Sequence, residues 1–285
     1  MNNKIKITES PREAFQAYKD FLPADKKAEY INVLLKAGFD IIDVGSFVSP
    51  KAVPKLKDTA EVIEKLDLSN TDTKILTSVG NIRGAENAVV FDEINYIGFL
   101  YSVSPAFLKL NINSTPEQAL ITMENIYDLC IKNNKIPVVD LCLAFGNPYG
   151  DAFSTDDVLV AVEKIRDKGI KKIVLADTLA CGDDTIIEKV FKLCINQFHD
   201  IEFGFHLHTE HSSWEQKTDA AYKAGCRSFD SVLLGLGGCP MSGKEMISNL
   251  STENLVLYCK KNNLKTNIIE SCYNDALYMA NNLFK

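Results

Sequence analysis

Short apolar runs rich in β-branched residues alternate with amphipathic stretches along the whole sequence, and this alternation limits the folds open to the chain. Eight of the short runs have the length and composition of buried β-strands. The stretches between them carry apolar residues at the spacing that one face of a helix requires. The predicted strands are 4–8, 39–44, 73–79, 94–101, 136–144, 171–176, 201–207 and 227–234. The predicted helices are 24–37, 54–66, 82–91, 115–133, 154–168, 183–197, 212–224, 251–262 and 268–283.

Eight strand–helix units in succession predict an α/β protein folded as a single (β/α)8 TIM barrel, with one or two extra helices at its C-terminal side. The 285 residues suit one such barrel, which typically takes about 250 residues. Because no linker or low-complexity segment divides the chain, we expect one domain over residues 1–285. The alternative is a doubly wound open sheet, which usually has fewer strands and a Gly-x-Gly-x-x-Gly turn after the first strand; this sequence lacks that turn.

The composition excludes several classes of protein. A formal net charge of −7 argues against a nucleic-acid binder, which needs a basic face. No run approaches 18 apolar residues, so we expect neither a signal peptide nor a membrane partner. The 8 cysteines include no Cys-x-x-Cys pair, and most lie in apolar runs, which is typical of reduced, buried thiols in a cytoplasmic protein. The cysteines in apolar runs are Cys130, Cys142, Cys194, Cys226 and Cys259.

Polar and charged residues follow several of the predicted strands. In a (β/α)8 barrel, the functional side chains lie where the strands run into the following loops. The residues at these positions are Arg12 and Glu13 after the first strand, Asp43 in the second, Asp177 after the sixth, and His206 and His208 at the end of the seventh. Taken singly, Arg12 could form a salt bridge and each Asp could cap a helix. Their coincidence at one mouth favours a functional site.

His206 and His208 are two residues apart on a predicted strand, so both imidazoles point to the same face. Two imidazoles on one rim suit a divalent cation whose shell is completed by carboxylate, amide or water oxygens. On spacing alone, two hydrogen-bonded histidines of a polar barrel mouth explain the pattern better. The acids at neighbouring strand ends favour the metal.

The run Gly235-Leu236-Gly237-Gly238-Cys239-Pro240 predicts a loop after the eighth strand, because it can form neither a stable helix nor a strand. A thiol exposed there near cations favours thiolate chemistry or proton transfer, and the glycines suit a lid that closes over substrate. A tight turn with an incidental cysteine is the alternative. Asn249 follows, either as a helix cap or as an amide ligand of the metal.

These stretches resemble the 3-hydroxy-3-methylglutaryl-CoA (HMG-CoA) lyases, in a superfamily of metal-dependent Claisen-type (β/α)8 barrels, and the resemblance runs nearly end to end. The Gly235–Pro240 run is the most specific match. The other matching stretches are Ser46-Phe47-Val48-Ser49-Pro50-Lys51, Asn81-Ile82-Arg83-Gly84, Asn111-Ile112-Asn113, Pro148-Tyr149-Gly150, Asp177-Thr178, His206-Leu207-His208 and Asn249-Leu250-Ser251-Thr252-Glu253.

The resemblance assigns roles at the matching positions. It implies one divalent cation per chain, Mg²⁺ or Mn²⁺, held by Glu13, His206, His208 and Asn249. The catalytic residues it implies are Arg12, which stabilises the developing enolate, Asp177, which lies near the substrate hydroxyl, and the loop thiol of Cys239. The supporting residues are Asp43 and Glu253, and the candidates for substrate binding are Ser46, Lys51, Arg83 and Asn113. We also expect an acyl-CoA substrate and a homodimer.

This chain departs from the family pattern around the first two strands. The family has Pro-Arg-Asp-Gly where this chain has Pro11-Arg12-Glu13-Ala14, and a Glu where it has Asp43. One carboxylate is a methylene longer and its neighbour a methylene shorter, so we expect Glu13 still to bind the metal. A further family Glu falls at Thr8, with Glu9 displaced by one position and facing the other way. The reaction type is therefore better indicated than the substrate.

The reaction implied is a retro-Claisen cleavage of HMG-CoA, or of a close 3-hydroxyacyl-CoA, to acetyl-CoA and acetoacetate. One alternative is an acetyl-CoA-dependent condensing enzyme of the same superfamily. Another is a barrel that has lost catalysis and serves as a binding protein. The altered Glu13-Ala14 pair would be the mark of the second alternative, and the retained Arg12 and Cys239 argue against it.

Overall fold

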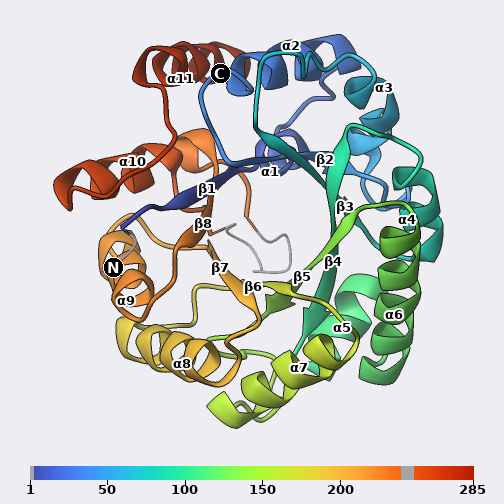
Figure 1. The fold of residues 1–285 in the computed structure, drawn as a ribbon, viewed down its shortest axis with the longest axis vertical. Helices are drawn as coiled ribbons and strands as arrows, with labels where there is room; N and C mark the ends of the chain where they lie inside the picture. Colours follow the sequence, from blue (N-terminus) through green and yellow to red (C-terminus); the bar gives the residue numbers. More distant parts are fainter. Residues whose placement is uncertain (1–2, 239–246) are drawn as a thin grey trace.

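Eight parallel strands close into a barrel in the order of the sequence (Figure 1). The structure is a computed structural model that describes residues 3–238 and 247–285. The strands are β1 (Lys6–Glu9), β2 (Ile41–Ser46), β3 (Lys74–Val79), β4 (Ile94–Ser102), β5 (Ile136–Cys142), β6 (Lys172–Asp177), β7 (Glu202–Leu207) and β8 (Ser228–Ser231). Pairing of β8 with β1 completes the ring. The predicted (β/α)8 barrel is confirmed, and the open sheet is excluded.

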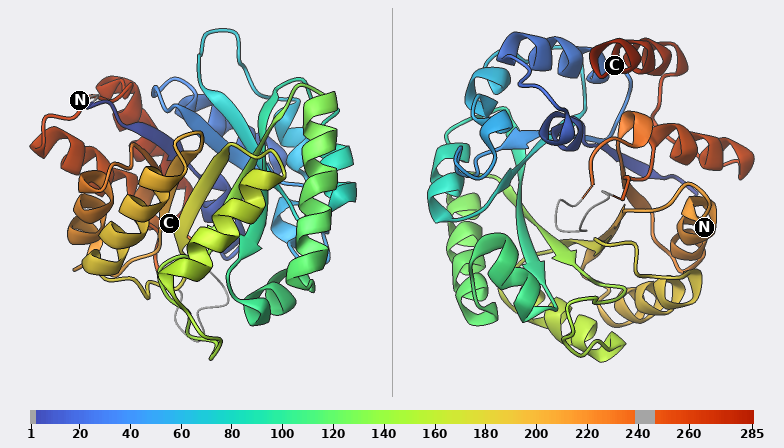
Figure 2. Two further views of the ribbon diagram at one scale, coloured as in Figure 1. Left: turned by 60° about the horizontal axis from the view of Figure 1, so that its bottom comes forward. Right: turned by 180° about the vertical axis from the view of Figure 1, so that it is seen from behind.

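The helices form a layer around the barrel (Figure 2). The α-helices are α1 (Pro11–Ala17), α2 (Ala24–Leu34), α3 (Thr59–Ile63), α4 (Ile82–Ala88), α5 (Pro105–Ile112), α6 (Pro116–Lys132), α7 (Thr155–Asp167), α8 (Asp184–Gln197), α9 (Trp214–Lys223), α10 (Thr252–Lys261) and α11 (Glu270–Leu283), and two 3₁₀ turns are η1 (Pro54–Leu56) and η2 (Leu233–Gly235). Two helices follow β8, in line with the predicted C-terminal additions.

Two local predictions were wrong, and two short helices were not predicted. The predicted helix 54–66 is broken into η1 and α3, because Asp58 between them leaves helical geometry and its carboxylate pairs with buried Lys27. The predicted strand 227–234 stops at Ser231, since Leu234 adopts a positive φ of 64° inside η2. Helices α1 and α5 were not predicted, because 7 and 8 residues are too few to show a helical period.

Alternate strand residues face the helices and the lumen. Ile42, Phe205 and Phe229 belong to the apolar core between barrel and helices. Their neighbours Asp43, His206 and Asp230 therefore point into the lumen, which places polar groups there.

The C-terminal helix buttresses the first helix of the chain. The Phe284 ring lies 6.1 Å from that of Phe15 on α1 and 5.6 Å from that of Tyr30 on α2. The backbone of Lys265 also accepts from Ile5 N (2.8 Å) and donates to Asn3 O (3.0 Å). The segment before α11 is thereby joined to the residues that directly precede β1.

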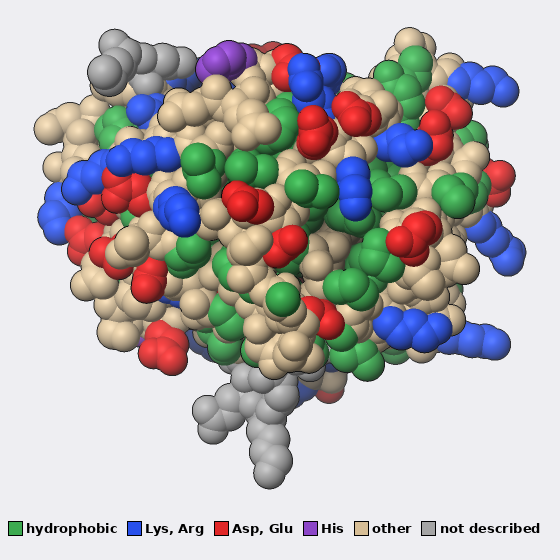
Figure 3. All heavy atoms as spheres, turned by 90° about the horizontal axis from the view of Figure 1, so that it is seen from below, with side chains coloured by type: hydrophobic (Ala, Val, Ile, Leu, Met, Phe, Trp, Pro, Cys, Tyr) green, Lys and Arg blue, Asp and Glu red, His purple; other side chains and the backbone are tan. Residues whose placement is uncertain are grey.

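The surface carries charges of both signs. On the face shown in Figure 3, acidic and basic side chains are interspersed with scattered apolar ones. Within residues 3–238 and 247–285, no helix is long and apolar enough to cross a membrane. Cys130, Cys142, Cys194, Cys226 and Cys259 are buried, as predicted.

Candidate active site

Arg12 and Glu13 lie in the first turn of α1, directly after β1. Pro11 at the start of α1 fixes a helical φ and lacks an N–H that would need a partner. The Arg12 guanidinium donates from Nε to Asp43 Oδ2 (2.9 Å) and from Nη1 to Glu13 Oε1. Burial alone lowers the pKa of Arg12, but the charges of Asp43 and Glu13 outweigh it and raise this pKa above its ordinary value. Arg12 is therefore a permanent cation at the mouth.

Asp43 on β2 is held by Arg12 on one side only. Its Oδ2 accepts from the guanidinium, whereas its buried Oδ1 has no hydrogen-bond partner among the described residues. Burial raises the pKa of Asp43 to about 6, and Arg12 opposes the rise. A buried oxygen without a partner is costly, so this carboxylate is poised to accept a hydrogen bond from a ligand or water.

His206 on β7 and His208, which directly follows β7, face each other through their Nε2 atoms, which are 3.1 Å apart. His208 Nδ1 lies 2.6 Å from the carbonyl oxygen of Thr178, and His206 Nδ1 lies 3.3 Å from Asp230 Oδ2. Both partners are acceptors, so each Nδ1 carries the hydrogen and each neutral ring presents a lone pair at Nε2. Two lone pairs at this separation repel unless a proton or a cation lies between them.

The surroundings set the two pKa values apart. Burial lowers the pKa of His206, but its hydrogen bond to Asp230 and the charges of Asp230, Glu13 and Asp140 together raise this pKa overall. Burial and the charge of His206 lower the pKa of His208 to about 4. His208 is thus neutral at pH 7, the form in which imidazole binds metal.

Asn249 and Glu13 lie beside this pair. Asn249 forms an antiparallel bridge with His208, and its Nδ2 donates to Leu236 O (2.8 Å), which leaves Oδ1 as the acceptor end. A Cβ placed on Gly237 would be 2.9 Å from Asn249 Nδ2 and 3.0 Å from Glu13 Cβ. Gly237 therefore allows the two side chains to approach each other, and its φ of 88° also favours glycine.

The donor set fits a divalent cation. Two nitrogens bound to one ion at about 2.1 Å and at a right angle are about 3.0 Å apart, close to the separation of the two Nε2 atoms. The Asn249 amide oxygen suits Mg²⁺ or Mn²⁺. Among residues 3–238 and 247–285, no three His, Cys, Asp or Glu side chains form a group that could hold a metal ion, and Glu13 is paired with Arg12. Glu13 as a ligand stays a prediction.

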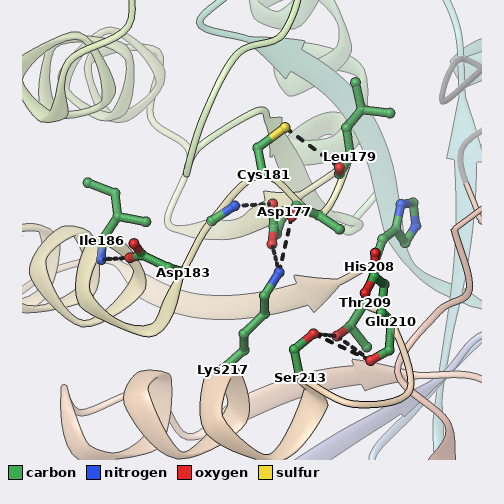
Figure 4. Close-up of polar contacts among 12 residues, drawn as sticks. Asp177, Leu179, Cys181, Asp183, Ile186, His208, Thr209, Glu210, Ser213 and Lys217 are labelled. Atoms are coloured by element: carbon green, nitrogen blue, oxygen red, sulfur yellow. Dashed lines mark hydrogen bonds and ion pairs between the residues drawn. The ribbon is translucent and has the colours of Figure 1, made fainter.

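Asp177 at the end of β6 is held by two partners (Figure 4). Lys217 reaches from α9 and donates to Asp177 Oδ2 (2.9 Å), and Gly182 N donates to Oδ1 (3.1 Å). Both Lys217 and Asp177 are buried. Burial raises the pKa of Asp177, and Lys217 opposes the rise. The arrangement fixes the turn that carries the Thr178 carbonyl, and hence the orientation of the His208 ring.

Glu253 and Glu9 support the segment that leads to the glycine run. Leu234 N donates to both carboxylate oxygens of Glu253 (3.1 Å each). Glu9 faces away from the lumen, accepting from Leu233 N (2.8 Å) and Thr252 Oγ1 (2.5 Å). Cys239 lies outside the described residues.

The four predicted substrate-binding residues lie in different settings. Ser46 is buried at the end of β2, and its Oγ accepts from Val48 N (3.1 Å). Lys51 and Arg83 are exposed in the segments that follow β2 and β3. Asn113 caps the C-terminus of α5 in a left-handed conformation with φ 49°, and its contact with substrate stays a prediction.

Comparison with known proteins places this geometry in a family. The model of the family described as HMGL-like matches residues 4–273, which is most of the sequence. The chain belongs to the HMGL-like family.

Relatives within this family are named as lyases. A hydroxymethylglutaryl-CoA lyase of Bacillus subtilis, YngG, is 28% identical over 266 residues, which are 93% of this chain and 88% of that protein. An (R)-citramalyl-CoA lyase of Chloroflexus aurantiacus is 28% identical over 257 residues, 87% of this chain and 80% of the relative. The solved structure of an HMG-CoA lyase from Acinetobacter baumannii, in complex with coenzyme A and 3-methylmalate, has a TM-score of 0.90 at 28% identity and covers 99% of this chain and 90% of that chain.

The structure of this HMGL-like chain also shows charged residues at the site that sequence reasoning missed. Asp140 on β5 and Asp230 on β8 point into the lumen with His206, and burial followed by the charge of Asp230 raises the pKa of Asp140 to about 7. One feature of the sequence could have pointed to Asp140: it is an acid inside an apolar strand, Val138-Val139-Asp140-Leu141. Lys217 gave no signal, since its partner is distant in sequence.

Proposed function

We propose that the chain is a divalent-metal-dependent lyase that cleaves HMG-CoA, or a close 3-hydroxyacyl-CoA, to acetyl-CoA and a ketone, which is acetoacetate for HMG-CoA. The observation that carries the proposal is the pair of opposed Nε2 atoms of His206 and His208 at the mouth that also holds Arg12. Membership of the HMGL-like family supports it, as do relatives named lyases over most of their length. The chain is a carbon–carbon lyase, as these relatives are.

The cation would be held by His206, His208 and Asn249, with Glu13 joining if it leaves Arg12. When bound, a divalent cation polarises the oxygens of the substrate and lowers the pKa of its hydroxyl group. The Thr178 carbonyl and the Asp230 carboxylate hold the two imidazoles in the tautomer that presents Nε2. These contacts orient the site before substrate arrives.

The cleavage begins with removal of the proton from the tertiary hydroxyl. Asp177 or a water beside it is the predicted acceptor. Because both Asp177 oxygens are bonded, to Lys217 on α9 and to Gly182 N, Asp177 would act only through such a water. The C2–C3 bond then breaks, C3 becomes a ketone, and the electron pair passes to C2 as the enolate of acetyl-CoA. Arg12 stabilises the enolate oxygen through its fixed charge. The predicted role of Cys239 is to deliver the proton to C2.

The coenzyme needs a route to the mouth. A cavity of about 220 Å³ lies between α1 and the segment after β2 and is bordered by Glu13, Val53 and Lys55. Lys51 and Arg83 on neighbouring segments would supply positive charge for the phosphates of coenzyme A. We also propose that the protein is a homodimer, as the resemblance implies. Light scattering would measure the mass of the particle in solution.

The test combines substrate, metal and one variant. Purified protein with Mg²⁺ and HMG-CoA should form acetoacetate and acetyl-CoA, and EDTA should abolish both until Mg²⁺ is restored. His208→Asn should lower kcat/KM by about 100-fold or more, whereas exposed Asp128→Asn on α6 serves as the matched control. Turnover that neither EDTA nor His208→Asn affects would refute the dependence on a metal. If the protein cleaves no 3-hydroxyacyl-CoA, the proposed lyase activity is refuted.

A further inference from the structure

Asp140 is a charged residue in the wall of the lumen, on β5. Its neighbours Val139 and Leu141 belong to the apolar core under the helices, so the side chain of Asp140 points the other way, into the barrel. Asp140 is partly exposed, although it lies in an otherwise apolar strand. Because β5 is four strands from β1 in either direction around the ring, Asp140 lies across the lumen from the strand that leads to Arg12.

Asp140 differs from the other acids of the lumen because it has no partner. Asp43 and Glu13 are paired with Arg12, and Asp230 with His206. No described residue forms a hydrogen bond or an ion pair with the Asp140 carboxylate, although it interacts electrostatically with Asp230 and His206. A half-buried carboxylate that nothing in the protein satisfies is available to a ligand.

The surroundings restrict what that ligand group can be. Four carboxylates, those of Glu13, Asp43, Asp140 and Asp230, share the lumen with one guanidinium and the proposed divalent cation. The charges of the neighbouring carboxylates oppose the binding of a further carboxylate beside Asp140. In its ionised form, the Asp140 carboxylate accepts hydrogen bonds and donates none. Its natural partner is therefore a hydroxyl or an ammonium group.

Two leucines form part of the neighbouring wall. Leu100 on β4 is paired in register with Asp140. A Cβ placed on Gly98 would be 3.8 Å from Leu76 Cδ2 and 3.5 Å from Ser78 Oγ, so Leu76 and a hydroxyl lie together there. Both leucines are partly exposed. A methyl or methylene group of a branched acyl chain would pack there, with a polar end directed to Asp140.

We infer that Asp140 determines specificity: it accepts a hydrogen bond from a hydroxyl or ammonium at the far end of the acyl group, so the enzyme prefers 3-hydroxyacyl-CoA substrates with such a donor to those ending in a carboxylate. This inference rests on the proposed lyase function and narrows its substrate class. The reaction is unchanged, since the end of the acyl group that Asp140 contacts takes no part in the cleavage of the C2–C3 bond.

Four substrates that differ only at this end test the inference. All carry the 3-hydroxy-3-methyl unit, and the chain ends in a carboxylate (HMG-CoA), a hydroxymethyl, an aminomethyl or a methyl group. Each releases acetyl-CoA on cleavage, so one assay gives kcat and KM for all. The proteins are wild type, Asp140→Asn, which has nearly the same shape without the charge, and the surface control Asp128→Asn.

Wild type should use the hydroxymethyl or aminomethyl substrate with kcat/KM at least about tenfold above that for HMG-CoA and for the methyl substrate. Asp140→Asn should reduce this preference about tenfold, mainly through KM, and raise kcat/KM for HMG-CoA. Preference of wild type for HMG-CoA, or equal use of all four, would overturn the inference and leave the lyase intact. Loss of HMG-CoA cleavage in Asp140→Asn would also overturn it, because Asp140 would then be a protonated acid that donates a hydrogen bond to the carboxylate of HMG-CoA. No acetyl-CoA from any substrate would overturn the proposed function and this inference with it.

Discussion

Replacing Glu9 by Gln should make the stability of the protein less dependent on pH. Glu9 is fully buried outside the barrel lumen, where it accepts from Leu233 N and Thr252 Oγ1. Burial raises its pKa from 4.5 to about 8, the two hydrogen bonds oppose the rise, and nearby Glu253 adds to it. Between these two pH values the folded protein keeps a proton that the unfolded chain has lost.

The sign and size follow from linkage. The folded state binds more protons than the unfolded state between pH 4.5 and about 8, so Glu9 lowers the free energy of unfolding as pH rises through this window. At about 1.4 kcal/mol per pH unit, the loss reaches about 5 kcal/mol above pH 8. Gln cannot ionise, and its amide can accept from Leu233 N while donating to Thr252 Oγ1. Glu9→Gln should therefore match wild type within about 1 kcal/mol near pH 5 and exceed it by about 3–5 kcal/mol near pH 9.

Urea denaturation followed by circular dichroism at pH 5, 7 and 9 measures the difference. Glu86→Gln, an exposed acid on α4, is the matched control and should follow wild type at every pH. A constant offset between Glu9→Gln and wild type across the pH range would show that Glu9 is ionised in the folded protein throughout, and the reasoning would be wrong.

Three further substitutions test the site. Lys217→Met leaves Asp177 buried without its cation and should cost about 3–5 kcal/mol in urea denaturation; a double variant that also carries Asp177→Asn should recover part of the loss, and no recovery would contradict the pairing. Gly237→Ala places a Cβ 2.9 Å from Asn249 Nδ2 and should weaken Mn²⁺ binding about tenfold by calorimetry; unchanged affinity would remove Asn249 from the metal site. Cys239→Ala should lower kcat about 100-fold, and unchanged turnover would remove the thiol from the mechanism.

The sequence was sufficient for the barrel because its signals are local. Each strand is a run of apolar, β-branched residues, and each longer helix carries its own period, so eight repeats specify the ring without knowledge of any contact. The short helix α1 and the positive φ of Leu234 were not predicted, because neither produces a periodic pattern in the sequence. These irregular pieces adjoin the mouth, where local rules are broken most often.

The site was predictable only in part, for a related reason. The positions of Arg12, His206 and Asn249 followed from strand ends and from the family resemblance, whereas their bonding partners depend on tertiary contacts. Lys217 meets Asp177 across 40 positions of sequence, and no spacing rule connects a residue of α9 with the end of β6. Asp140 likewise lacks a partner because no described residue of the neighbouring strands places a hydrogen-bond donor or a cation within reach of its carboxylate, and the sequence alone does not show this.

The contact between Phe284 and Phe15 links the periphery to the chemistry. Phe15 is on the same short helix as Arg12 and Glu13. The packing of its ring therefore helps to fix the position of the Arg12 guanidinium. Phe284→Ala would remove the ring that packs against Phe15 and so loosen α1, without altering a group that meets substrate. A substitution in this outer layer would therefore change the position of Arg12, for which we propose the stabilisation of the enolate, while every side chain that meets substrate stays the same.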